Sequence, residues 1–62
     1  MRKTAFTKHL RKNGCEFKRQ GSKHEIWENP KNNSWTTVPR HSEIKHSLCI
    51  KICKDLGIDS PK

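Results

Sequence analysis

Long apolar segments are missing from this 62-residue sequence, in which hydrophobic residues make up only 29% of the positions. No stretch approaches the roughly 20 apolar residues that a membrane-spanning helix needs. The first residues, among them Thr4, Lys8 and His9, also lack the apolar run of a secretory signal. We therefore expect a cytoplasmic protein without a membrane partner.

Cysteine is scarce and odd in number, with only Cys15, Cys49 and Cys53 present. Three thiols do not form the dense disulfide framework of a small secreted domain, and they fit a reducing cytosol better. Cys49 and Cys53 lie one helical turn apart and could begin a zinc site with His41 or His46, but structural zinc usually draws on tighter ligand spacings. We expect two small core residues instead, with neither a metal ion nor a small-molecule cofactor.

Acidic residues are also few, because 6 Asp and Glu stand against 14 Lys and Arg and leave a formal net charge of +8. The basic residues run from Arg2 to Lys62 and form no separate tail, so the charge belongs to the folded body. A chain this small buries too little surface to enclose a deep pocket. The composition therefore favours a polyanion bound across an open surface, and nucleic acid is the partner we expect.

Two segments carry the three- and four-residue spacing of an amphipathic helix. The first covers residues 5–13, with Thr4 as the expected N-cap and Gly14 as the left-handed residue that ends it. The second ends at Gly57 and carries the apolar residues Leu48, Cys49, Ile52, Cys53 and Leu56. Residues 59–62 are expected to fray.

Three short segments between these helices have the composition and alternation of strands: residues 15–20, 23–28 and 34–38, with a turn at 29–33 and a stop at Pro39. The second segment places His24, Ile26 and Glu28 on one face and Glu25 and Trp27 on the other.

The element order predicts an α+β fold of type αβββα, in one domain over residues 1–62. Both helices pack on one face of a three-stranded antiparallel sheet, and the opposite face stays open. This is the architecture of double-stranded RNA-binding domains, which recognise shape and phosphates more than sequence.

His24 is the first catalytic candidate, because it follows Gly21 and Ser22 on the second predicted strand and is flanked by Arg19 and Lys23. An imidazole also titrates in the useful pH range. RNA is cut without a metal when a base removes the proton of a ribose 2′-hydroxyl while cationic donors stabilise the charge on the phosphate. Gly21 would let the backbone approach a phosphate, and Ser22 could donate a hydrogen bond to it. Arg19 and Lys23 could hold the anion. On composition alone, a single strand histidine is more often structural or merely exposed than catalytic.

The sequence also resembles the HicA toxin pattern over nearly its whole length. The resemblance is carried by Gly21-Ser22-Lys23-His24, Val38-Pro39-Arg40-His41, Glu43-Ile44-Lys45, and then Leu48, Ile52, Lys54, Leu56, Gly57 and Ile58. It implies a metal-independent ribonuclease of double-stranded-RNA-binding-like fold that cleaves mRNA and is inhibited by a HicB-type antitoxin. The family's catalytic histidine maps onto His24. Many relatives have a second histidine where this chain has Lys23.

The remaining candidates keep two interpretations each. His41, beside Arg40, could supply a second proton transfer or be a structural loop residue. Trp27 and Trp35 could stack on unpaired bases or belong to the core. With His24 as the catalytic residue, the expected RNA contacts are Arg19, Gly21, Ser22, Lys23, Arg40 and His41.

Two alternatives to a ribonuclease follow from the same residues. A non-catalytic RNA-binding module would hold structured RNA on the same basic face, with His24 as a hydrogen-bonding residue. A protein-binding subunit would use its positive charge to hold an acidic partner.

Overall fold

The computed structural model describes residues 1–61 and confirms the predicted α+β fold. The elements are α1 (Lys3–Lys12), β1 (Glu16–Gln20), β2 (His24–Asn29), β3 (Ser34–Pro39) and α2 (His46–Leu56). The strands form an antiparallel meander in the order β1-β2-β3, so β2 is central. Each strand begins and ends within one residue of its predicted range.

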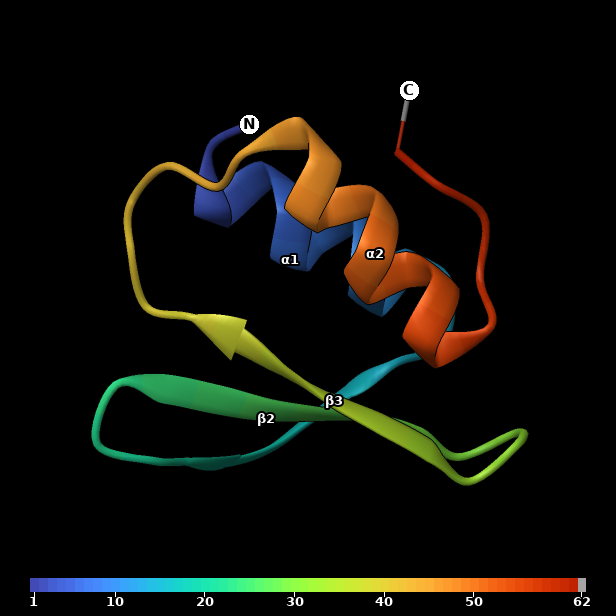
Figure 1. Cartoon of the computed structure of the whole chain (residues 1–62). Helices are drawn as coiled ribbons and strands as arrows, with labels where there is room; N and C mark the ends of the chain where they lie inside the picture. Colours follow the sequence, from blue (N-terminus) through green and yellow to red (C-terminus); the bar gives the residue numbers. More distant parts are fainter. Residues whose placement is uncertain (62) are drawn as a thin grey trace.

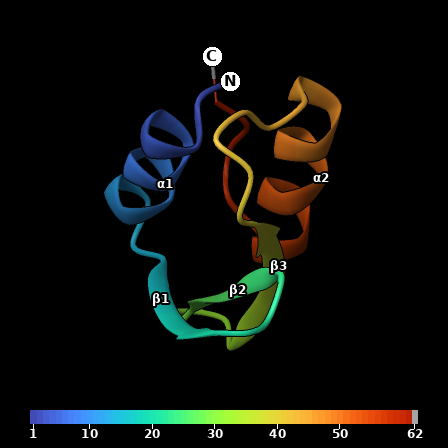
Figure 2. The same cartoon turned by 90° about the vertical axis from the view of Figure 1, so that its left-hand side faces the viewer.

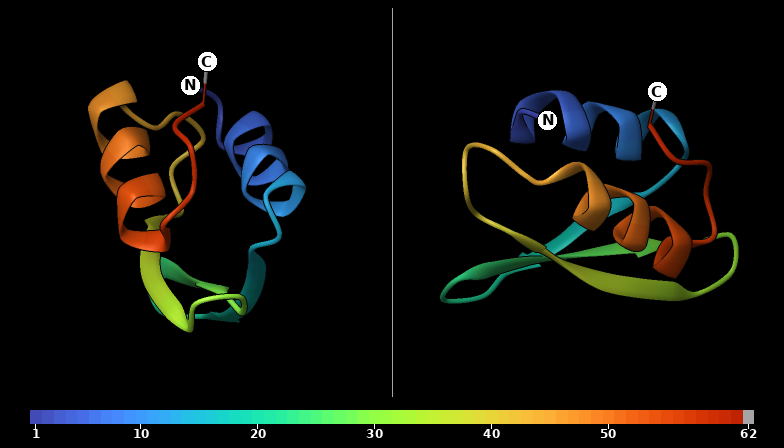
Figure 3. Two further views of the ribbon diagram at one scale, coloured as in Figure 1. Left: turned by 90° about the vertical axis from the view of Figure 1, so that its right-hand side faces the viewer. Right: turned by 45° about the horizontal axis from the view of Figure 1, so that its top comes forward.

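Both helices lie on the same side of the sheet (Figure 1). Viewed from the end, α1 stands on the side of β1 and α2 on the side of β3 (Figure 2). No helix or other segment covers the opposite face of the sheet within residues 1–61 (Figure 3). The predicted two-layer arrangement with one open face is therefore present.

The core lies between the helices and the sheet, and Trp27 is its largest fully buried side chain, with 1% of its surface exposed. Phe17 meets the indole edge-on, with ring centroids 5.9 Å apart, and the Arg11 guanidinium lies 5.1 Å from the ring centroid. Trp27 is thus a core residue, whereas Trp35 is 62% exposed. The other buried apolar residues are Phe6, Leu10, Cys15, Val38, Ile44, Cys49, Ile52, Cys53 and Leu56.

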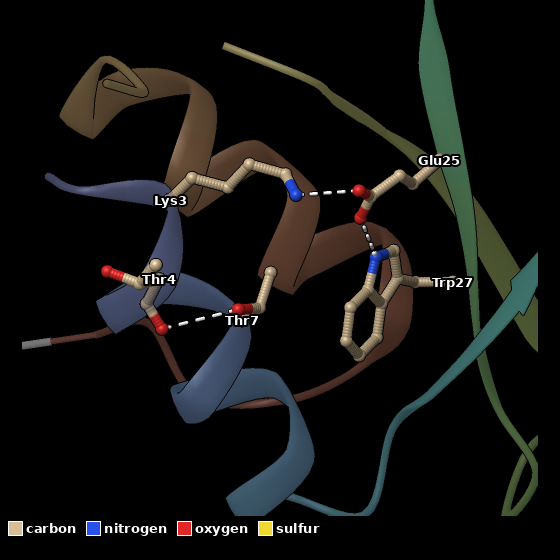
Figure 4. Close-up of polar contacts among 5 residues, drawn as sticks. All are labelled: Lys3, Thr4, Thr7, Glu25 and Trp27. Carbon is tan, nitrogen blue, oxygen red and sulfur yellow. Dashed lines mark hydrogen bonds and ion pairs between the residues drawn. The ribbon is translucent and has the colours of Figure 1, made fainter. Parts of the chain in front are cut away.

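Glu25 ties α1 to the central strand (Figure 4). Its carboxylate accepts hydrogen bonds from Lys3 Nζ at 2.6 Å and from Trp27 Nε1 at 3.0 Å. Burial by itself would raise the pKa of Glu25, but the hydrogen bonds from Lys3 and Trp27 and the charges of Lys3 and Arg40 outweigh it, so the pKa lies below its usual value. The carboxylate therefore stabilises the fold in its ionised form.

The turn between β2 and β3 caps the end of α2. Asn29 and Asn32 each donate a side-chain hydrogen bond to the Leu56 carbonyl, at 2.8 Å and 3.1 Å. Gly57, which was predicted to end α2, adopts the left-handed conformation with φ 71°, and the Ile58 N–H then donates to the Cys53 carbonyl at 3.0 Å. The side-chain amides of Asn29, at the end of β2, and of Asn32, in the turn, thus fix the position of α2 over the sheet.

The predicted N-cap at Thr4 is wrong, because α1 begins at Lys3 and its N-cap residue is Arg2, which makes no side-chain capping bond. The cause is a tertiary contact. The Lys3 N–H donates to the Ser42 carbonyl at 2.9 Å, and Arg2 pairs with Glu43 in an isolated antiparallel bridge. A backbone carbonyl of the loop before α2 therefore accepts a hydrogen bond from the first turn of α1, as the Thr4 side chain was expected to do.

The expected fraying of residues 59–62 is wrong for residues 59–61. His9 Nε2 donates to the Asp59 carbonyl at 2.8 Å, and Pro61 is buried. Lys62 lies outside the described residues.

Strand β1 contains a β-bulge at Lys18. Phe17 pairs with Trp27, but Arg19, not Lys18, pairs with Ile26. A bulge adds one residue and resets the alternation of side chains along the strand. Lys18 and Arg19 consequently share the open face with Ile26.

Replacing Glu25 with Gln is expected to lower the unfolding free energy at neutral pH by about 1.5 kcal/mol, since hydrogen bonds to a charged group are being weakened. Because the folded pKa lies below the usual 4.5, this stabilisation is present above pH 4.5 and is lost as the pH falls through the folded value. Urea unfolding of both proteins at pH 7 and pH 3 measures the difference. An equal gap at both pH values would contradict the role of the carboxylate charge.

Asn29→Ala is expected to destabilise the protein by about 2 kcal/mol, because the Leu56 carbonyl loses a buried donor. Asn33→Gly is the matched control in the same turn: Asn33 has φ 60°, which glycine adopts without strain, so its unfolding free energy should change by less than about 0.5 kcal/mol. Thermal unfolding compares the two. Equal effects would refute the capping role.

Candidate functional site

The tight turn between β1 and β2 sets the position of His24. The Gly21 N–H donates to the His24 carbonyl at 2.7 Å, which closes the hairpin and leaves Ser22 and Lys23 at its tip. A Cβ at position 21 would lie 3.1 Å from that carbonyl oxygen, closer than side-chain carbons normally approach. Because glycine has no Cβ, the backbone at position 21 can approach the His24 carbonyl this closely.

Ser22, Lys23, His24, Arg40 and His41 line a single shallow hollow of about 350 Å³ at this end of the molecule. The turn between β1 and β2 and the chain that leaves β3 lie at the same end of the sheet (Figure 1). All five were predicted as site residues from the sequence.

The strand register explains why these two segments meet. His24, the first residue of β2, pairs with Pro39, the last residue of β3. Arg40 and His41 follow directly along the chain and so emerge beside His24. Pro39 was expected to stop the strand before it, but it belongs to β3, where an edge position tolerates the missing N–H.

The lining of the hollow is polar and positively charged. It contains the charges of Lys23 and Arg40, the imidazoles of His24 and His41, and one hydroxyl, and no acidic residue is among the described residues that line it. His24 and His41 are both exposed. The hollow therefore has the composition of an anion site that contains two groups able to accept or donate a proton.

Two residues that the sequence reasoning missed support this hollow. With its amide oxygen turned towards Arg40, Gln20 accepts hydrogen bonds from Nη1 at 2.9 Å and Nη2 at 3.2 Å. Glu25, which pairs with Gln20 across the strands, also contributes its charge near Arg40. The sequence did contain a signal for this arrangement. A hairpin with Ser22 and Lys23 at its tip pairs position 21 with 24 and position 20 with 25, which places Gln20 beside Glu25.

Arg19 does not line the hollow with His24, although the sequence grouped it with Lys23. It lies further along the open face of the sheet, in a second hollow of about 320 Å³ with Lys18, Ile26, Glu28 and Trp35. The predicted site residues therefore fall into two places. One is the end of the sheet and the other is its open face.

The cysteines that raised the zinc alternative are buried in the core and free. Burial raises the pKa of the Cys53 thiol to about 11, helped by the nearby Cys49 and Cys15. Within residues 1–61 no three His, Cys, Asp or Glu side chains gather closely enough to hold a metal ion. The helices found in that same range are too short and too polar to span a membrane.

Comparison with known proteins gives one match. Neither the curated proteins nor the solved structures contain a protein that matches this chain. A family model described as the HicA toxin of bacterial toxin-antitoxin matches residues 5–58, which is most of the chain and includes the whole sheet and the hollow. The chain therefore belongs to the HicA toxin family of bacterial toxin–antitoxin systems.

Proposed function

We propose that this toxin is a metal-independent endoribonuclease that cleaves mRNA at the hollow between the β1–β2 turn and the end of β3. The observation that carries the proposal is the convergence of two histidines, one lysine and one arginine on one hollow, from segments about fifteen residues apart in sequence. A body this small offers RNA a surface more than an enclosed pocket, and a polymer substrate suits such a surface.

In the proposed reaction His24 removes the proton from a ribose 2′-hydroxyl. The 2′ oxygen then forms a bond to the adjacent phosphorus while the bond from phosphorus to the 5′ oxygen of the next nucleotide breaks. The departing 5′ oxygen takes a proton from the protonated His24 or from His41. The products are a 2′,3′-cyclic phosphate and a 5′-hydroxyl end, so protons and bonds balance without a metal ion.

Lys23 and Arg40 stabilise the additional negative charge that gathers on the phosphate oxygens during the attack. Arg40 is the better oriented donor, because the Gln20 amide oxygen accepts hydrogen bonds from its guanidinium. Ser22, at the tip of the turn, donates a hydrogen bond to the same phosphate. Arg19 contacts the RNA outside the cleaved bond, on the open face.

The proposed inhibitor is a HicB-type antitoxin with an acidic surface. A net charge of +8 attracts such a surface, and covering the exposed hollow would exclude RNA from His24. Both the toxin and its partner are expected to act in the cytoplasm, where mRNA is present.

His24→Ala is expected to lower cleavage of a defined RNA in EDTA by at least about 100-fold, the usual contribution of a general base. The same variant should cause no growth arrest when expressed. His46→Ala is the matched control, since His46 is an exposed histidine at the start of α2 and does not line the hollow. Its cleavage rate should equal that of the wild type.

RNA binding by His24→Ala separates the alternatives. Retained binding with lost cleavage fits the ribonuclease. Growth arrest that persists in His24→Ala, together with unchanged RNA binding, would indicate the non-catalytic RNA-binding module. A bound acidic partner protein that a phosphate-rich competitor does not displace would indicate the protein-binding subunit.

Arg40→Ala is expected to slow cleavage by about 10-fold or more, because the phosphate loses a positioned cationic donor. Lys54→Ala removes an equal charge from the last turn of α2 and should leave the rate within about 2-fold, since surface charges far from a site are screened. Single-turnover cleavage at physiological salt measures both. Equal losses would mean that only the net charge of the chain matters.

A further inference from the structure

The open face of the sheet carries a feature that cleavage at His24 does not use. Trp35 is 62% exposed, the largest exposed fraction among the large hydrophobic residues of the described chain. Its indole lines the hollow of about 320 Å³ that also contains Lys18, Arg19, Ile26 and Glu28. A hollow with an apolar floor and a charged rim is suited to a flat ligand that has an anionic substituent.

The bulge in β1 supplies the charge of this hollow. In a regular strand Lys18 and Arg19 would point to opposite faces, but the extra residue at Lys18 brings both to the open face. Lys18 lies 3.6 Å from the Glu28 carboxylate, so this lysine already has an acidic partner within the hollow. Arg19 is the other positively charged residue of this hollow. It makes no ion pair with a carboxylate among the ion pairs of the described residues.

The position of Glu28 determines how a nucleotide would lie. Glu28 pairs with Trp35 across the strands, and both point to the open face. A carboxylate repels a phosphate, so the part of a nucleotide that covers the indole is its base. The phosphate of the same nucleotide is expected near Arg19. This residue lies on β1 and pairs with Ile26 of β2, the central strand.

The hollow lies within reach of the cleavage site along β2. His24 and Glu28 are four residues apart on the same face, which is about 13 Å at roughly 3.3 Å per residue. An extended RNA strand bound at His24 can therefore pass over Ile26 and continue to Trp35 without leaving the sheet.

We propose that Trp35 stacks on an unpaired base of the RNA, within a few nucleotides of the cleaved bond, while Arg19 holds a phosphate of the same segment. This inference rests on the proposed function and specifies its substrate class: RNA that is single-stranded beside the cut. Bases stack on aromatic side chains only when they are not already stacked inside a duplex. The toxin therefore selects unpaired RNA, although its architecture resembles that of domains that bind double strands.

The test measures RNA affinity in the His24→Ala background, so that no RNA is cut. The probes are a labelled unpaired oligonucleotide and the same strand annealed to its complement, with Trp35 replaced by Ala, Leu or Phe. Trp35→Ala and Trp35→Leu should each weaken binding of the unpaired strand by about 10-fold, whereas Trp35→Phe stays within about 3-fold because it keeps an aromatic face. The affinity for the duplex should not change.

Ile50→Ala is the matched control, since Ile50 is a 40% exposed apolar residue on α2. It should leave both affinities unchanged. Circular dichroism of each variant confirms the fold, and Trp35→Leu keeps the test decisive if Trp35→Ala fails to fold.

Unchanged affinity in Trp35→Ala, or equal losses for unpaired RNA and duplex, would overturn the stacking role. Loss of self-association in Trp35→Ala with RNA affinity intact would assign the face to a second copy of the chain and overturn it as well. Failure of the proposed function is distinguishable: wild-type cleavage by the single His24→Ala variant would refute the catalysis. The affinities would then be measured with 2′-O-methyl RNA, which has no free 2′-hydroxyl to react, so the stacking role is still tested.

Discussion

The burial of one indole determines how the rest of this molecule is arranged. Trp27 sits on the central strand with 1% of its surface exposed, and Phe17, Arg11 and the Glu25 carboxylate surround it. Because side chains alternate along a strand, turning Trp27 towards the helices turns His24 towards solvent. With only 29% hydrophobic residues the chain can cover one face of its sheet, and the other face remains open for a partner.

The pairing of the strands explains why the residues of the His24 hollow gather at one end of the sheet. Antiparallel pairing of β2 with β3 brings His24 opposite Pro39, so the two residues that follow β3 reach the hollow without any dedicated loop. Glu25 connects this region to the body, since it holds Lys3 of α1 and contributes a charge near Arg40. In the proposed ribonuclease, a small fold thereby positions its reacting groups through strand register and one partly buried carboxylate.

Local patterns predicted much of this structure, and long-range contacts account for what they missed. Alternation placed Trp27 and His24 on opposite faces, and Gly57 ended α2 as expected, because both depend on neighbouring residues. The N-cap of α1 depends on Ser42, some forty residues away, and no local pattern shows this. Likewise, the bulge that brings Lys18 and Arg19 to the same face depends on how β1 pairs with β2, and the motif around His24 could not indicate it.

The central claim is that His24 acts on the ribose 2′-hydroxyl, and the substrate itself provides the most direct measurement. An RNA oligonucleotide that the toxin cuts is compared, in EDTA, with a version that carries a 2′-deoxyribose at the cleaved position. The account predicts that the RNA yields a 2′,3′-cyclic phosphate and a 5′-hydroxyl end and that the substituted strand resists cleavage there. Cleavage of the 2′-deoxy strand at the same bond would contradict it.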